Sequence, residues 1–183
     1  MPASVRPATP EDAPVLAEVA AATFALACPP HVTRESVETF IRTVLSEQCF
    51  EDYLVDDLRD LLIAEDEAGP LGYAMVVAGE PADDDVRSAL TRLPTVELSK
   101  IYVLPRSHGT GAAAELMAAA LARAGQRGAA GVWLGVNQLN ERAQRFYTKS
   151  GFTRVGTKKF LVGDRYEDDF VYERRLDDGQ ASL

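Results

Sequence analysis

The stretch between residues 96 and 124 constrains the fold most, because a predicted strand, a glycine-containing loop and a predicted helix follow one another directly. Residues 96–103 are predicted as the strand, and residues 112–124, rich in Ala and Leu, as the helix. The loop reads Arg106-Ser107-His108-Gly109-Thr110-Gly111. Glycine lets the backbone turn tightly, while free N–H groups and the positive dipole end of a helix attract negative oxygens. The loop therefore predicts an anion site into which a pyrophosphate would fit.

Three other interpretations of this loop must be weighed. Its glycines also satisfy the GxGxxA form of the dinucleotide-binding fingerprint, but that fold expects an acidic residue about 20 positions further on, where this chain has Gly135-Val136-Asn137. A Walker loop needs Gly-Lys followed by Ser or Thr, and the loop contains no lysine. A strand-to-helix turn with glycines for geometry alone stays open on this motif by itself.

The rest of the chain predicts helices at its start and then an alternation of strands and helices. Apolar residues three and four apart indicate helices, and runs of β-branched and apolar residues bounded by turn residues indicate strands. Residues 79–94 are predicted as a surface loop with one helical turn over 86–93. We expect helices over 10–26, 33–45, 50–58 and 141–150, and strands over 5–7, 61–64, 72–77, 132–136, 152–162 and 169–176.

Length, composition and charge limit the function classes. A chain of 183 residues with 46% hydrophobic and 26% charged residues is expected to form a single domain over residues 1–183. The net charge of -9, from 28 acidic and 19 basic residues, argues against a phosphate-binding surface for nucleic acid. Such a charge can attract a cationic substrate, although it also serves solubility.

Cysteine and histidine are too few for a disulfide framework or a zinc site. The chain contains Cys28, Cys49, His31 and His108, without a CxxC motif. No stretch approaches the roughly 20 apolar residues of a membrane span, and the start lacks a basic segment followed by an apolar run. We therefore expect a cytoplasmic protein without membrane contact, with a frayed tail over 177–183.

Two motifs resemble signatures of the Gcn5-related N-acetyltransferase (GNAT) superfamily. The turn Arg106-x-x-Gly109-x-Gly111 is similar to the family's (Q/R)xxGx(G/A) signature, and residues 140–152 are similar to its NxxAxxFYxxxGF segment. The resemblance covers roughly residues 60–176. It implies an α/β (α+β) fold, in which helices flank a mixed, mostly antiparallel sheet of six to seven strands around a central β-loop-α site for acetyl-coenzyme A.

The resemblance also implies which residues contact the cofactor. The diphosphate of coenzyme A would bind the loop amides, and the pantetheine arm would pair like an extra strand with the backbone before the loop. Asn140 resembles the family's residue that hydrogen-bonds the cofactor. With acetyl-coenzyme A as cosubstrate and no metal ion, the predicted cofactor-binding residues are Ile101, Tyr102, Val103, Arg106, Ser107, His108, Gly109, Thr110, Gly111, Ala112, Asn140 and Tyr147.

Two side chains are predicted to be catalytic by the same resemblance. Glu97 matches the position of the general base in the histone acetyltransferases of the superfamily, and Tyr147 matches the general acid that protonates the leaving thiolate. A backbone N–H of the strand before the loop would polarise the thioester carbonyl. The structural alternatives are a surface or ion-paired carboxylate near Lys100 for Glu97, and a core tyrosine for Tyr147. Other candidates for the base are Glu80 and Asp66.

The chain is similar above all to the bacterial spermidine/spermine N-acetyltransferase (PaiA-like) subgroup, through residues 97–103, 132–136 and 160–164. This resemblance implies direct transfer, through a tetrahedral intermediate, of an acetyl group to a primary amine of a small molecule, with a polyamine as one candidate. An acetyltransferase acting on a protein N-terminus or lysine is the first alternative. A noncatalytic acyl-coenzyme A-binding module is an alternative of another class, and a homodimer is one candidate assembly.

Overall fold

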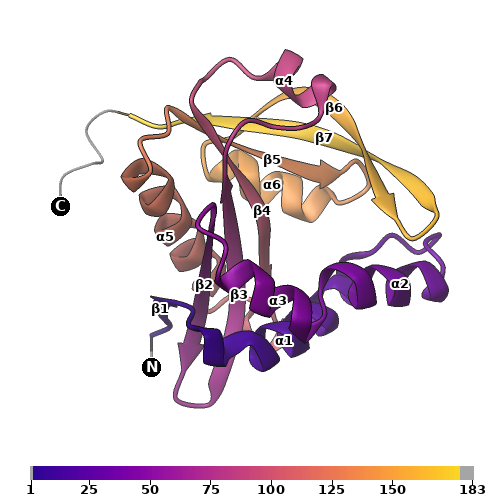
Figure 1. The fold of residues 1–183 in the computed structure, drawn as a ribbon, viewed down its shortest axis with the longest axis vertical. Helices are drawn as coiled ribbons and strands as arrows, with labels where there is room; N and C mark the ends of the chain where they lie inside the picture. The colour runs from indigo at the N-terminus through magenta and orange to yellow at the C-terminus, as the bar shows by residue number, and fades with distance from the viewer. Residues whose placement is uncertain (1, 178–183) are drawn as a thin grey trace.

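The computed structural model describes residues 2–177, so the predicted frayed tail falls outside the described residues from 178 onward. Seven strands form one sheet in the order β1-β2-β3-β4-β5-β7-β6 (Figure 1). Neighbouring strands are antiparallel except β4 and β5, which are parallel. The mixed, mostly antiparallel sheet expected from the sequence is confirmed. The strands are β1 Ser4–Pro7, β2 Arg59–Asp66, β3 Gly69–Ala78, β4 Thr95–Val103, β5 Gly131–Asn137, β6 Thr153–Val162 and β7 Arg165–Arg175.

Helices cover both faces of this sheet. Because alternate residues of a strand face opposite sides, β2 contributes to two cores. Leu61 and Ile63 pack with α1, α2 and α3, whereas Leu62 and Ala64 pack with α5. The helices are α1 Ala13–Ala27, α2 Arg34–Val44, α3 Glu47–Leu54, α4 Asp84–Ala89, α5 Ala112–Gln126 and α6 Glu141–Lys149, with 3-10 turns at Pro10–Asp12 and Pro105–Ser107.

Several element boundaries differ from the sequence-based prediction, among them the starts of α3, α4 and β7. α3 starts at Glu47 rather than at residue 50, because Ser46 Oγ accepts a hydrogen bond from the N–H of Cys49 at 3.2 Å and caps the helix. α4 likewise starts early, since the carboxylate of Asp83 accepts from the N–H groups of the first turn. β7 starts at Arg165 rather than at residue 169, because its first residues already pair with the end of β6.

A bulge in β4 determines which of its side chains share a face. The register between β3 and β4 shifts beside Val76, so β4 contains one more residue than β3 over this stretch. Glu97 and Lys100, three residues apart, would face opposite sides of a regular strand. Both pair with β3 residues that pack against the helices α1–α3, as does Tyr102. The bulge therefore brings these three side chains to one face of the sheet.

β4 and β5 separate after a short parallel segment. Their pairing is confined to Thr95–Glu97 against Gly131–Trp133. Beyond it, β4 continues along β3 as far as Val103, while β5 continues along β7 as far as Asn137. The edge of β4 that faces β5 is therefore left without a strand partner in its second half. This opening leads towards the glycine loop before α5.

A buried carboxylate on β7 anchors the segment that leads into β4. Glu173 is 7% exposed. Its carboxylate accepts hydrogen bonds from the N–H groups of Thr91 and Arg92 at 2.9 and 3.0 Å, and from the hydroxyl of Thr91 at 2.5 Å. Hydrogen bonds to a charged group are the strong ones, so this carboxylate positions the start of β4 relative to β7.

We expect Glu173→Ala to lower the free energy of unfolding by about 2 kcal/mol, because it removes several hydrogen bonds to a charged group and leaves the loop amides unpaired. Urea unfolding followed by circular dichroism measures the change. Glu38→Ala is the control, since Glu38 forms an ion pair only with Arg34 on the exposed surface, and it should cost no more than about 0.5 kcal/mol. Equal losses in the two variants would contradict the anchoring role of Glu173.

Candidate active site

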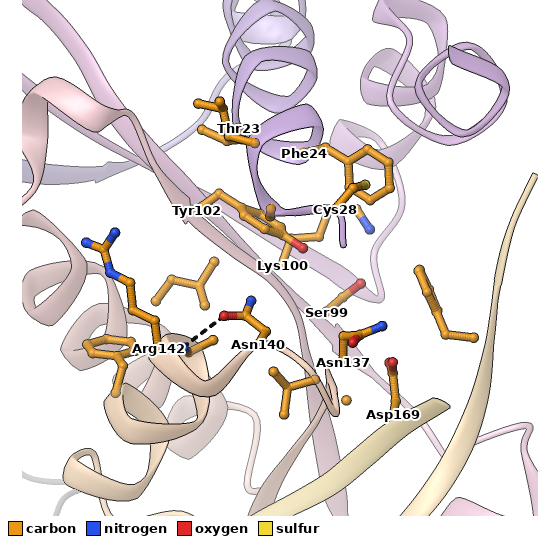
Figure 2. A pocket seen from close by; sticks show the side chains of 18 of the residues that line it. Thr23, Phe24, Cys28, Ser99, Lys100, Tyr102, Asn137, Asn140, Arg142 and Asp169 are labelled. Carbon is orange, nitrogen blue, oxygen red and sulfur yellow. Dashed lines mark hydrogen bonds between the residues drawn. The ribbon is translucent and has the colours of Figure 1, made fainter. Parts of the chain in front are cut away.

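A cavity of about 460 Å³ occupies the opening between β4 and β5. Its walls come from these two strands, from α1 and the segment after it, from α6, and from the hairpin of β6 and β7. Figure 2 shows Tyr102 and Lys100 near the middle of the pocket, between Arg142 on one side and Asp169 on the other. Segments that are far apart in the chain thus contribute to one site.

The cavity brings both predicted catalytic side chains together with part of the predicted cofactor set. It is lined by Glu97, Ile101, Tyr102, Val103, His108, Asn140 and Tyr147. The other predicted residues do not line the cavity but belong to the adjoining loop and the start of α5: Arg106, Ser107, Gly109, Thr110, Gly111 and Ala112. Two of their side chains face the β2–β3 turn instead. Ser107 Oγ donates to the carbonyl oxygen of Leu71 at 2.9 Å, and the Arg106 guanidinium donates to that of Pro70 at 2.7 Å.

The glycine loop uses some of its N–H groups internally and leaves others available. Gly109 and Gly111 have φ angles of 82° and 88°, in the region that favours glycine. Other N–H groups of the loop donate to its own carbonyls, namely those of Ser107, His108 and Thr110. In the first turn of α5, the N–H groups of residues 113 and 114 have no helical carbonyl one turn earlier to accept them. An anion at this loop would therefore meet the N-terminus of α5.

α6 contributes an aromatic hydroxyl and a capping side chain. The ring of Tyr147 lies 6.1 Å from that of Phe152 and 6.5 Å from that of Tyr172, centroid to centroid. Burial raises the pKa of the Tyr147 hydroxyl well above its ordinary value, so the group is a proton donor at neutral pH. Asn140 Oδ1 accepts from the N–H of Ala143 at 3.1 Å and caps α6, as the dashed line in Figure 2 shows.

Glu97 and Lys100 face the cavity from β4 without pairing with each other. None of the ion pairs among residues 2–177 includes either side chain. Burial raises the pKa of Glu97, although Lys100 partly opposes the shift. Burial also lowers the pKa of Lys100 to about 8. An ion pair between Glu97 and Lys100 is therefore not formed, and burial makes Glu97 a stronger proton acceptor than an exposed carboxylate.

Two acids of β7 line the cavity and were missed by the sequence analysis. The carboxylate oxygens of Glu167 lie 2.8 and 2.9 Å from His31 Nε2, and Glu167 Oε2 also accepts from Asn137 Nδ2 at 3.4 Å. Asp169 is 5% exposed, and no hydrogen bond reaches its Oδ1. Desolvation raises the pKa of Asp169 to about 6, with Lys158 opposing the shift. Their alternate positions in the sequence could have indicated that Glu167 and Asp169 share a face. Which face of the sheet that is follows only from the pairing of β7 with its neighbours.

The cavity also contains a thiol, Cys28. Burial raises the pKa of this thiol to about 11, so it is protonated and a poor nucleophile at neutral pH. Within residues 2–177, no three His, Cys, Asp or Glu side chains converge as metal ligands. No helix in this part of the chain has the length and apolar character needed to span a membrane.

We expect Asp169→Asn to stabilise the protein at pH 7.5 by about 3 kcal/mol, because each unit by which burial raises the pKa of Asp169 corresponds to about 1.4 kcal/mol. The pKa of Asp169 is higher in the folded than in the unfolded chain, so the folded state binds the proton more tightly and loses stability as the pH rises from about 4 through 6. The gain should therefore vanish near pH 4. Urea unfolding at both pH values measures it.

Asp168→Asn is the matched control for this prediction. Asp168 lies next to Asp169 but is exposed and ion-paired with Lys159. Its replacement should give no comparable gain at pH 7.5. A loss of stability in Asp169→Asn at pH 7.5 would mean that the Asp169 charge is compensated in the folded protein.

Sequence comparisons match this chain to acetyltransferases. The model of the acetyltransferase (GNAT) family matches residues 22–152. An uncharacterised N-acetyltransferase of Mycobacterium tuberculosis (strain H37Rv) is 48% identical over 165 residues, which are 90% of this chain and 98% of that protein. An uncharacterised N-acetyltransferase of Lactobacillus delbrueckii subsp. lactis is 27% identical over 158 residues, 80% of this chain and 91% of that protein.

Solved structures share the fold at low sequence identity. The PaiA N-acetyltransferase of Thermoplasma acidophilum, solved in complex with coenzyme A, superposes with a TM-score of 0.77 at 19% identity, over 96% of this chain and 100% of that one. The ribosomal-protein-S18-alanine N-acetyltransferase of Escherichia coli gives a TM-score of 0.69 at 16% identity, over 99% and 98%. On the family match and the 48% identical relative, this chain belongs to the GNAT family of acetyltransferases.

Proposed function

We propose that the protein transfers the acetyl group of acetyl-coenzyme A to the primary amine of a small molecule, with residues 1–183 acting as one domain. The observation that carries the proposal is a single cavity, beside the N-terminus of α5, that contains both Glu97 and Tyr147. A proton acceptor and a proton donor in one enclosed space are what acyl transfer to an ammonium group requires.

The residues around the opening fit coenzyme A. When bound, acetyl-coenzyme A supplies an acetyl group activated as a thioester. The N-terminus of α5 offers N–H groups and a positive dipole end to the diphosphate. Arg142, which the sequence analysis did not select, adds a cation to the lining. The unpaired edge of β4 from Ile101 to Val103 offers backbone groups to an extended pantetheine arm.

Glu97 and Tyr147 handle the two protons of the reaction in this proposal. Glu97 takes a proton from the acceptor's ammonium group, directly or through water, so that the neutral nitrogen can attack the thioester carbonyl. As the N–C bond forms and the C–S bond breaks, Tyr147 donates its proton to the departing sulfur, and the second proton lost by the nitrogen returns through solvent to the Tyr147 oxygen. Burial keeps Tyr147 protonated, as a general acid requires, and it raises the pKa of Glu97, which makes this carboxylate a stronger proton acceptor.

The cavity is compatible with more than one class of amine acceptor. A polyamine is one candidate, supported by the net charge of -9 and by the acids Glu97, Glu167 and Asp169 in the lining. It is also the acceptor class of the PaiA-like subgroup that the sequence resembles. A protein N-terminus or lysine is the second candidate, and a homodimer stays a prediction. A noncatalytic module is disfavoured because it would not need Glu97 and Tyr147 in one cavity.

The first experiment is thermal melting of the purified protein with acetyl-coenzyme A, coenzyme A or NAD at equal millimolar concentrations. A ligand that binds only the native state raises the melting temperature. Release of free thiol in the presence of primary amines then tests transfer. A shift with NAD alone, or none with either coenzyme A ligand, would overturn the proposal.

We expect Tyr147→Phe to lower kcat about 100-fold, the lower part of the range for a general acid, because the phenyl ring keeps the packing but cannot donate a proton. The melting shift with acetyl-coenzyme A should persist. Tyr166→Phe, at a tyrosine that is 70% exposed, is the control and should keep full activity. Unchanged kcat in Tyr147→Phe would assign Tyr147 to the core.

We expect Glu97→Gln to lower kcat/KM about 100-fold at pH 7. The loss should shrink at high pH, because there the amine loses its proton without help. In the native enzyme, the acid limb of the pH profile should lie above the ordinary carboxyl range, since burial raises the pKa of Glu97. Glu80→Gln is the control on the exposed surface. An equal loss at all pH values would argue against a base role for Glu97.

A further inference from the structure

Asp169 lines the cavity, and one of its carboxylate oxygens is buried without a hydrogen-bond partner. Among residues 2–177, its Oδ1 is the only buried side-chain nitrogen or oxygen atom without a hydrogen-bond partner. The side chain is 5% exposed, and Figure 2 shows it beside Asn137 and Ser99. A buried carboxylate without a partner is costly to the fold, so its position calls for a ligand that donates hydrogen bonds.

Two lysines line the same part of the cavity. Lys158 is the cross-strand partner of Asp169 in the β6–β7 hairpin, and Lys100 faces the cavity from β4. Gly135 of β5 lies under the first pair: a Cβ placed there would be 3.2 Å from Asp169 Oδ2 and 3.8 Å from Lys158 Nζ. Glycine at position 135 therefore lets the side chains of Asp169 and Lys158 lie over β5, where a Cβ would crowd them.

The two faces of the β6–β7 hairpin differ in whether their cross-strand charges form an ion pair. On the outer face, Lys159 and Asp168 are cross-strand partners and form an ion pair. On the cavity face, Lys158 and Asp169 are also cross-strand partners, yet neither belongs to any ion pair among residues 2–177. The hairpin can hold such a pair together, and on the cavity side it keeps the two charges apart.

The geometry points to an acceptor that carries both an amine and a carboxylate, with its ammonium facing the acids Asp169 and Glu97 and its carboxylate on Lys158 and Lys100. This inference rests on the proposed function and names the substrate class of the same site. Cross-strand neighbours have Cβ atoms about 5 Å apart, so the two charged groups of the acceptor should be separated by only a few atoms. Amino acids with a short spacer between nitrogen and carboxylate meet this condition.

The same charges count against a polyamine. A polyamine would satisfy Asp169, but its further ammonium groups would lie in a cavity with Lys158 and Lys100, and like charges repel strongly where water is excluded. Glu97 can offset one further ammonium group, but Glu167 offers little compensation, because His31 and Asn137 already engage it. An amino acid neutralises both kinds of charge at once.

The test measures acceptor binding separately from turnover. Titration calorimetry is carried out on the protein alone and on its complex with coenzyme A, which cannot transfer an acetyl group. The probes are glycine, β-alanine and 4-aminobutyrate, the amides of these three acids, and 1,4-diaminobutane and spermidine. We expect at least one acid to bind about tenfold more tightly than its own amide and than either polyamine.

Variants assign the two charged groups. Lys158→Gln should weaken binding of the preferred acid about tenfold and leave binding of its amide unchanged, whereas Asp169→Asn should weaken both. Lys159→Gln and Asp168→Asn, on the outer face of the same hairpin, are the matched controls and should bind like the native protein. Circular dichroism and melting of each variant show that it is folded.

The outcomes separate the two proposals. If coenzyme A does not bind, the proposed function fails, and the titrations on the protein alone still test the acceptor site. If coenzyme A binds but polyamines bind more tightly than every acid, if each acid and its amide bind equally, or if no probe binds, the amino acid inference is overturned while the acetyltransferase proposal stands.

Discussion

The site depends on the path of β4, which is paired on one side throughout and on the other only at its start. One extra residue at the bulge places Glu97, Lys100 and Tyr102 on a common face. Separation from β5 after Glu97 then opens space in front of that face. Without the bulge, Glu97 would face the opposite core from Lys100 and Tyr102. Without the separation, β5 would fill the cavity. Both irregularities cost backbone hydrogen bonds, a cost that proteins commonly tolerate at functional sites.

Three acids on one face of β7 show how the same residue type can serve structure or binding. Glu173 is surrounded by N–H donors of the loop before β4, and Glu167 is engaged by His31 and Asn137. Asp169, between them, has an oxygen without a donor. A chain selected for stability alone would pair this oxygen or replace the acid, so the exception is most simply explained by a ligand.

The sequence predicted what is encoded locally. Residues 103–112 carry a strand end, a glycine turn and a helix start in succession, and the structure has these elements at the expected places. The bulge in β4 could not be predicted, because it is defined only by the register against β3. The acids of β7 were missed for a similar reason. β7 is polar on both faces in sequence, and pairing with β5 and β6 decides that Asp169 points inward while Asp168 points outward.

The family match therefore covers the cofactor half of the site better than the acceptor half. The proposed coenzyme A residues come from two continuous segments, and the family match over residues 22–152 includes all of them. The acceptor half is assembled from α1, β4, β6 and β7, and Lys158, Glu167 and Asp169 lie beyond that match. A shared fold thus accompanies both a PaiA enzyme and a ribosomal-protein alanine acetyltransferase among the structural neighbours. For this protein, the charges of the β6–β7 hairpin are the feature from which the acceptor must be argued.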